Sequence, residues 1–424
     1  MTEKIRRPIG KRKKLPQFTI MNVIEGQAGL ENYSSLFFYS LTIDNILNII
    51  VLLILAGVAI NLTVGNNGLF RRAENAANTW QMAEQNEQIE MDKASNFIED
   101  YMNGNGGSGN NTQGGGSEPG GETTTVGDLK PGDGEEVTIL DETTEVEDGL
   151  ENKVVIPGGF GIASDSGTNV EDGIVIEDED GNQFVWIPAK TEAEGGATIN
   201  LSTGGTANVV YQRTAFTGEN ITTDYTETMP SDEETSVNAN GGYYIGRYEA
   251  GDGSSTDFRS SATDGTVVIK KNQVPYNWIT QADTITKSKG MAGEQNYGNA
   301  FTKLVSSYAW DTALDFIQKA NSDNEHSDYA TNSPEGNYSN TNYGDALIRT
   351  GQTTSVSNIY DMGGNLWEYT TEGRPSVSAP YVPRGGSYVN VYDNDSAGGR
   401  IYSISGDAVS NYGFRITLYC STES

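Results

Sequence analysis

The residue types that most often carry catalysis or bind transition metals are scarce in this chain. Its 424 residues include one cysteine, Cys420, and one histidine, His326. An intrachain disulfide needs two cysteines, a structural zinc site needs several cysteines and histidines, and a cysteine nucleophile is usually activated by a histidine. We therefore expect no disulfide, no cysteine–histidine zinc cluster and no Cys-His dyad.

The single histidine could still serve a Ser-His-Asp triad as its base. It lies in the polar run NEHSD, residues 324–328, which has no apolar residue to bury. Such a run is typical of a solvated loop, where a histidine has no catalytic role. We favour the loop histidine over the triad.

Four consecutive acidic residues, 177–180, could bind calcium through their carboxylates. They lack the full spacing of a calcium loop. The apolar runs at 173–176 and 183–187 flank Asp180-Gly181-Asn182, which is a strong hairpin signal. We therefore favour a solvated hairpin tip over a calcium site.

The run YDMGGNLWEYT, residues 360–370, combines tight-turn and core residues. Gly363 and Gly364 permit a tight turn, whereas Trp367 and Tyr369 offer large apolar rings that each carry one polar group. The pattern predicts a loop that leads into a buried, aromatic element.

This run resembles the DMxGNxWEWT signature of formylglycine-generating-enzyme (sulfatase-modifying factor) domains. Shorter motifs of that family accompany it in order: FVWIP (184–188), YIGRYE (244–249), PYNW (275–278), YAW (308–310), RGGSY (384–388) and GFR (413–415). The resemblance covers about residues 153–419 and implies an α+β, C-type-lectin-like fold. It also implies that Asn365 and Glu368 help to hold a structural calcium ion. The alternative is that both side chains only form hydrogen bonds with loop backbone.

The chemistry of that family is not expected here. Formylglycine-generating enzymes bind copper through a pair of cysteines before the closing GFR motif, and this chain has no cysteine between Arg384 and Arg415. Other branches of the fold use histidine-bound iron, which one histidine cannot supply in the usual way. We expect a binding protein without copper. A sulfatase-modifying-type enzyme on the same fold remains the alternative.

The segment from Arg384 to Tyr419 contains no Lys, Glu, Gln, Met or Trp. Every residue type in it can be produced by replacing adenines in an asparagine AAY codon. The segment therefore resembles the variable region of proteins diversified by a diversity-generating retroelement. Tyrosine, serine, glycine and asparagine also make adaptable binding surfaces. The residues that we expect to face a ligand are Tyr388, Asn390, Tyr392, Asn394, Asp395, Tyr402, Ser403, Ser405 and Asp407. The alternative is a biased but invariant segment.

An apolar stretch at residues 46–64 has the length of a transmembrane helix. The basic residues before it favour a cytoplasmic amino terminus, which places the acidic remainder at the cell surface. We expect that cell to be a Gram-positive bacterium. A buried core helix and a cleaved signal are the alternatives. With a net charge of −31, the chain is not expected to bind nucleic acid.

The run IVLLILAGVAINLTVGNNGLF, residues 50–70, resembles the amino-terminal helix of type IV pilin-like proteins from Firmicutes, and helical periodicity continues from 69 to 102. The resemblance implies pilus or pseudopilus subunits as partners. A prepilin cleavage glycine is missing at the right place, which leaves processing open.

The expected organisation has four parts. Residues 1–42 form a basic cytoplasmic leader, 43–102 a transmembrane and amphipathic pilin-like helix, and 103–152 a flexible glycine-rich and acidic linker. Residues 153–420 form the ligand-binding domain, whose partner is an unidentified protein or glycan. Within the linker we expect a strand at 136–140, and within the domain a strand at 242–249 and an amphipathic helix at 307–320.

Overall fold

The computed structural model describes residues 124–422, except 133, 219, 321–324, 376–379, 393–394 and 404–405. The chain divides into two units, 1–116 and 117–424, and every described residue belongs to the second. The expected leader, membrane helix and glycine-rich part of the linker lie outside the described residues. Within the described part of the chain, no helix has the length and apolarity needed to cross a membrane.

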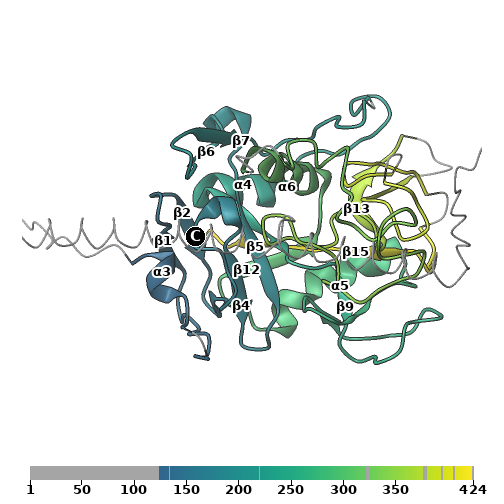
Figure 1. Ribbon diagram of the computed structural model, residues 1–424, viewed down its shortest axis with the longest axis horizontal. Coiled ribbons are helices and arrows are strands. Elements are labelled where there is room, and N and C mark those ends of the chain that lie inside the picture. Colours follow the sequence, from purple (N-terminus) through teal and green to yellow (C-terminus); the bar gives the residue numbers. More distant parts are fainter. Residues whose placement is uncertain are drawn as a thin grey trace, which may run out of the picture. The chain divides into compact units, whose positions relative to one another are not determined.

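A six-stranded sheet with antiparallel pairing forms the centre of this unit (Figure 1). In spatial order its strands are β12 (Ala300–Leu304), β16 (Ile416–Cys420), β8 (Gly242–Gly246), β5 (Gln183–Pro188), β4 (Val175–Asp178) and β3 (Phe160–Ile162). The predicted hairpin is present as β4 and β5, which pair with Val175 opposite Val185. Its turn uses Gly181 at φ 85°, a conformation that glycine adopts without strain.

Three helices cover this sheet. They are α4 (Ser231–Asn240), α5 (Gln281–Glu294) and α6 (Ser307–Ala320). Helix α4 packs on β8 and β16, α5 on β12, and α6 on β5. The bounds of α6 agree with the prediction, and the Ser306 hydroxyl caps it by accepting a hydrogen bond from the backbone N of Ala309 at 3.1 Å.

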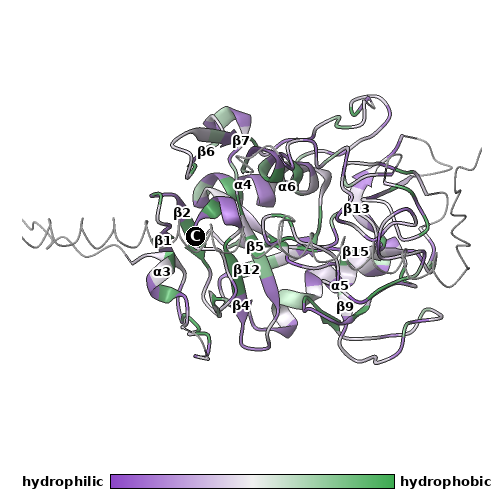
Figure 2. Ribbon diagram, viewed as in Figure 1, coloured by the Kyte–Doolittle hydropathy of each residue, from purple (hydrophilic) through white to green (hydrophobic). Residues whose placement is uncertain are grey.

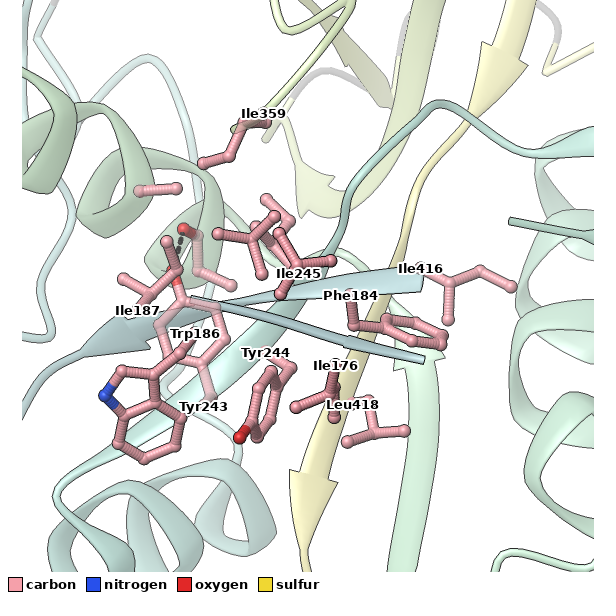
Figure 3. Packing of buried hydrophobic residues seen from close by; sticks show 14 of the residues in the cluster. Ile176, Phe184, Trp186, Ile187, Tyr243, Tyr244, Ile245, Ile359, Ile416 and Leu418 are labelled. Atoms are coloured by element: carbon pink, nitrogen blue, oxygen red, sulfur yellow. Dashed lines mark hydrogen bonds between the residues drawn. The ribbon is translucent and has the colours of Figure 1, made fainter. Parts of the chain in front are cut away.

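Residues of the inner strands are buried on both faces of the sheet, because helices and loops cover both sides. Figure 3 shows Trp186 of β5, Tyr244 of β8 and Leu418 of β16 on one face of the sheet, and Ile245 of β8 on the other. Hydrophobic residues concentrate on these strands (Figure 2). The predicted strand at 242–249 is present, but it ends at Gly246.

A second, three-stranded sheet carries the predicted motif. Strand β13 (Trp367–Gly373) lies between β14 (Tyr381–Arg384), to which it is antiparallel, and β15 (Tyr412–Phe414), to which it is parallel. A small sheet beside it contains β9 (Gly251–Asp252), β10 (Val267–Val268) and β11 (Val274–Pro275). The described unit is therefore mixed α and β, with sheet predominating.

The folded unit begins before the expected boundary at residue 153. The short helix α3 (Val126–Leu129) and strand β1 (Thr144–Glu147) place Val126 and Val146 in the core, both fully buried. Strand β1 pairs with β2 (Lys153–Ile156). A second hairpin joins β6 (Ala197–Asn200) to β7 (Thr206–Val209), and two 3-10 turns lie at η1 (Val170–Asp172) and η2 (Glu192–Glu194).

The strand expected at 136–140 does not form, so that prediction is wrong. Only the backbone of Leu140 pairs there, donating to the carbonyl of Phe160 at 2.9 Å and accepting from Gly159 at 2.7 Å. A regular strand would need a partner along its whole length.

Candidate functional site

Both ends of the compositionally biased segment are fixed by buried ion pairs. At one end, Arg384 donates to Asp311 of α6 over 2.6 Å. At the other, Arg415 donates to Glu368 of β13 over 2.7 Å. All four side chains are fully buried, and such pairs are held firmly because neither charge can be left unpaired. We call residues 388–411, which lie between them, the display segment.

A third arginine pins the display segment from within. Arg400 contacts Asp311 and lies 3.0 Å from Glu372 of β13 through its Nε atom. Glu372 also forms an ion pair with Arg213, which lies in the loop before α4. Arginines and carboxylates thus join α6, β13 and the display segment below the protein surface.

The aromatic residues of β13 form a platform under the segment. Trp367 and Tyr369 are two residues apart, so they point to the same face of the strand. Trp367 donates from its indole Nε1 to the side-chain oxygen of Asn390 at 2.9 Å. Tyr369 donates from its hydroxyl to the backbone carbonyl of Asp407 at 3.0 Å. The predicted apolar bodies are buried, and their polar groups hold the segment at two points.

The nine residues expected to face a ligand do not share one environment. Tyr402 is 52 % exposed and Asp407 is exposed. Tyr388, Asn390, Tyr392 and Asp395 are partly buried, and Ser403 is buried, with its backbone paired to Tyr381. Asn394 and Ser405 lie outside the described residues.

Val389 was missing from the expected set, although it is 54 % exposed. It lies in a turn closed by the hydrogen bond from the backbone N of Asn390 to the carbonyl of Ser387, 2.9 Å long. Valine usually signals a core or strand position, so its type points away from the surface. The preceding Gly385 and Gly386, at φ 90° and 76°, were the available signal for a turn.

The expected calcium ligands, Asn365 and Glu368, do not fit a calcium ion as they are arranged. The side-chain oxygen of Asn365 accepts from Asn337 Nδ2 at 2.8 Å and from the backbone N of Ile348 at 3.1 Å. Both oxygens of Glu368 accept from Arg415. Across the described ranges, no group of three or more His, Cys, Asp or Glu residues could hold a metal.

Two further carboxylates, Glu249 and Asp361, surround this pair. Burial raises the pKa of Asp361, and burial together with the neighbouring carboxylates raises that of Glu249 well above its ordinary value. Burial also raises the pKa of Glu368 to about 7, although Arg415 opposes the shift. The carboxylates around Arg415 raise the pKa of its guanidinium, although burial acts in the opposite direction. Perturbed groups of this kind occur at catalytic sites and in structural networks alike. Here Glu249 receives a hydrogen bond from Asn365, and the cluster is sealed from solvent.

The thiol of Cys420 and the imidazole of His326 are not arranged as a nucleophile and its base. Cys420 is 2 % exposed at the end of β16, and burial raises the pKa of its thiol to about 12, which makes it a poor nucleophile. His326 Nε2 faces Glu335 Oε1 at 3.2 Å, and its buried Nδ1 has no hydrogen-bond partner. A Ser-His-Asp triad needs the serine hydroxyl at Nε2 and the carboxylate at Nδ1–H, so neither nitrogen of His326 has the partner that a triad would give it.

Three hollows of the described structure have volumes of about 370, 410 and 590 Å³. They are lined by residues of loop 211–229, α4 and neighbouring elements, and none of the three is lined by the display segment. A ligand that binds the display segment would therefore contact its exposed side chains and not one of these hollows.

No protein-family profile and no curated protein matches this chain. Solved structures do match, among them "Treponema denticola variable protein 1", which is 14 % identical, with 57 % of this chain and 96 % of that chain aligned and a TM-score of 0.32. "Crystal Structure of CarF" is 16 % identical over 42 % of this chain and 87 % of that chain, with a TM-score of 0.32. "Structure of PvdO from Pseudomonas aeruginosa" is 12 % identical over 58 % of this chain and 97 % of that chain, with a TM-score of 0.34. Likenesses this remote assign neither a family nor an activity.

Proposed function

We propose that this chain is a surface-displayed ligand-binding protein whose display segment is diversified by a retroelement and presented on a C-type-lectin-like domain. The observation that carries the proposal is the contrast along the display segment. Its flanks are held by fully buried ion pairs at Arg384 and Arg415, whereas Val389 and Tyr402 between them are exposed. A segment fixed at its ends tolerates changes in its exposed middle.

The contacts between separate motifs support the C-type-lectin-like fold. Glu249 of YIGRYE accepts from Asn365 of the GGNLWEY run, and Glu368 of that run pairs with Arg415 of GFR. Trp310 of YAW donates to the carbonyl of Ala397 at 2.9 Å. Motifs far apart in the sequence thus meet in one structure, as a shared fold would require.

The site supports binding better than catalysis. Its exposed residues Val389, Tyr402 and Asp407 are apolar, aromatic and acidic, whereas the buried carboxylates are paired or shielded from solvent. The one thiol is buried and unreactive, which disfavours the alternative of a sulfatase-modifying-type enzyme. Purified protein should leave a cysteine-containing sulfatase peptide unoxidised in the presence of copper.

Anchoring belongs to the same proposal. Residues 46–64 would hold the chain in the membrane, and the glycine-rich stretch would tether the domain outside the cell, as an adhesin or receptor. Assembly with pilus or pseudopilus subunits would follow only if the pilin-like helix is released from the membrane. Mass spectrometry of the mature amino terminus tests that release.

The genomic neighbourhood tests diversification. We expect a near-copy of the DNA that encodes Arg384 to Arg415, differing from it only at adenines, beside a reverse transcriptase gene. A locus with no such copy and no reverse transcriptase would contradict the proposal.

A further inference from the structure

Asn390 of the display segment forms hydrogen bonds through its side-chain oxygen, its side-chain nitrogen and its backbone carbonyl. Its side-chain oxygen accepts from Trp367 Nε1 at 2.9 Å, from the backbone N of Ser387 at 3.1 Å and from the Ser387 hydroxyl at 2.6 Å. Its side-chain nitrogen donates to Asp395 Oδ2 at 2.9 Å. Its carbonyl accepts from both the backbone N and the hydroxyl of Ser339, each at 2.8 Å.

These bonds fasten the first half of the segment to the β13 platform. Trp367 begins β13, Ser387 begins the turn, and Asp395 lies five residues beyond Asn390, so one side chain joins three parts of the site. A lost partner would leave the buried indole N–H of Trp367 unsatisfied, which is costly. The side chain of Asn390 has little bonding capacity left for a ligand.

Val389 and Tyr402 differ from Asn390 because their side chains are exposed. Val389, one residue away, is 54 % exposed. Tyr402 is 52 % exposed, and the guanidinium of Arg374 lies 4.3 Å from its ring centre. Large exposed apolar side chains of this kind are what binding surfaces present.

We infer that Asn390 is a constant fastening residue inside the diversified segment, and that Val389 and Tyr402 are positions that determine which partner is bound. This rests on the proposed function. Among the residue types reachable from an AAY codon, asparagine is the only amide, and an amide both accepts from the indole and donates to Asp395. Aspartate keeps the length but has no N–H, and serine is too short.

A library of the full-length protein tests the distinction. Codons 389, 390 and 402 are replaced together by NNY, which yields the residue types accessible to adenine replacement. Cells that display the carboxy-terminally tagged protein are warmed, treated with thermolysin and sorted for intact chains. Asparagine should be enriched at 390 by about tenfold or more over other residues, because a buried hydrogen-bonded group is lost otherwise. Positions 389 and 402 should keep their input frequencies. Residue 390 as mixed as residue 389 after sorting would overturn the inference.

A charge exchange tests the contact itself. Asn390→Asp places a second carboxylate against Asp395 and should lower the unfolding temperature. Adding Asp395→Asn restores one donor and one acceptor to the pair, and should recover most of the loss. Additive losses in the double variant would contradict the assigned contact.

The two proposals fail in different ways. Isolates that are identical throughout residues 388–411 would remove the diversified binding function but leave the library result unchanged. Isolates that vary at 390 as freely as at 389 would keep the function and overturn the constant role of Asn390.

Discussion

Arg415 and Glu368 join the last strands of the domain through two side chains that are both fully buried. Arg415 Nε and one terminal nitrogen donate to the two carboxylate oxygens at 3.0 and 2.7 Å, and the other nitrogen donates to the carbonyl of Gly246 at 2.8 Å. A pair with these extra bonds is stable as a unit, whereas either partner alone is a buried charge.

Glu368→Ala should therefore lower the free energy of unfolding by about 3–5 kcal/mol, because Arg415 is left without its carboxylate. Urea denaturation of the purified protein measures the change. Lys153→Ala is the matched control. Lys153 forms an ion pair with Glu145 in which the two side chains are 63 % and 56 % exposed, so this change should have no measurable effect. Equal effects of the two changes would show that the buried pair of Glu368 and Arg415 contributes no more to stability than an exposed one.

The candidate residues could be predicted only in part. The composition of the segment pointed to the exposed Tyr402 and Asp407, but it could not separate Asn390, whose side chain is bonded to Trp367. Nothing in a single sequence tells an asparagine that is hydrogen-bonded within the fold from one that faces a ligand. Val389 was missed for the opposite reason, because its type suggests burial.

At the level of elements, local patterns were predicted well. The hairpin around Gly181 and helix α6 each depend on a short stretch of sequence, so turn chemistry and periodicity suffice to find them. The parallel pairing of β13 with β15 joins Trp367 to Tyr412, which are far apart in the chain, so no short stretch of sequence predicts it. The packing of Val126 and Val146 into the core was hidden in the same way within a segment expected to be a linker.

Glu227 couples two of these elements. It accepts from the backbone N of Ser307 at the start of α6 at 2.8 Å, and from the hydroxyls of Ser307 and of Thr371 on β13. Burial raises the pKa of its carboxyl from 4.5 to about 7, although these hydrogen bonds oppose the shift. The folded state therefore holds this proton to higher pH than the unfolded state does.

The stability that this proton contributes is fully present below about pH 4.5 and is lost as the pH rises through about 7. Glu227→Gln stays neutral and should remove this loss, of the order of 2 kcal/mol between those values. Urea midpoints of wild type and variant at pH 4.5 and pH 8 measure it. A difference between the two proteins that stays constant with pH would show that Glu227 does not titrate in this range.

The domain as a whole should fold without a metal ion at Asn365 and Glu368. Asn365 and Glu368 already have hydrogen-bond partners, and Arg415 supplies the positive charge that a calcium ion would bring. Exhaustive chelation should leave the unfolding temperature unchanged within about 1 °C. A fall that calcium restores and magnesium does not would contradict this reading.

Under the proposed function, the domain presents a diversified surface on a fixed frame. Sequencing of the DNA for Arg384 to Arg415 from many isolates of one population would test this. Substitutions should be concentrated at exposed positions such as Val389 and Tyr402, with Arg384, Asn390, Arg400 and Arg415 unchanged. Identical sequences across the segment, or substitutions spread evenly over buried and exposed positions, would contradict it.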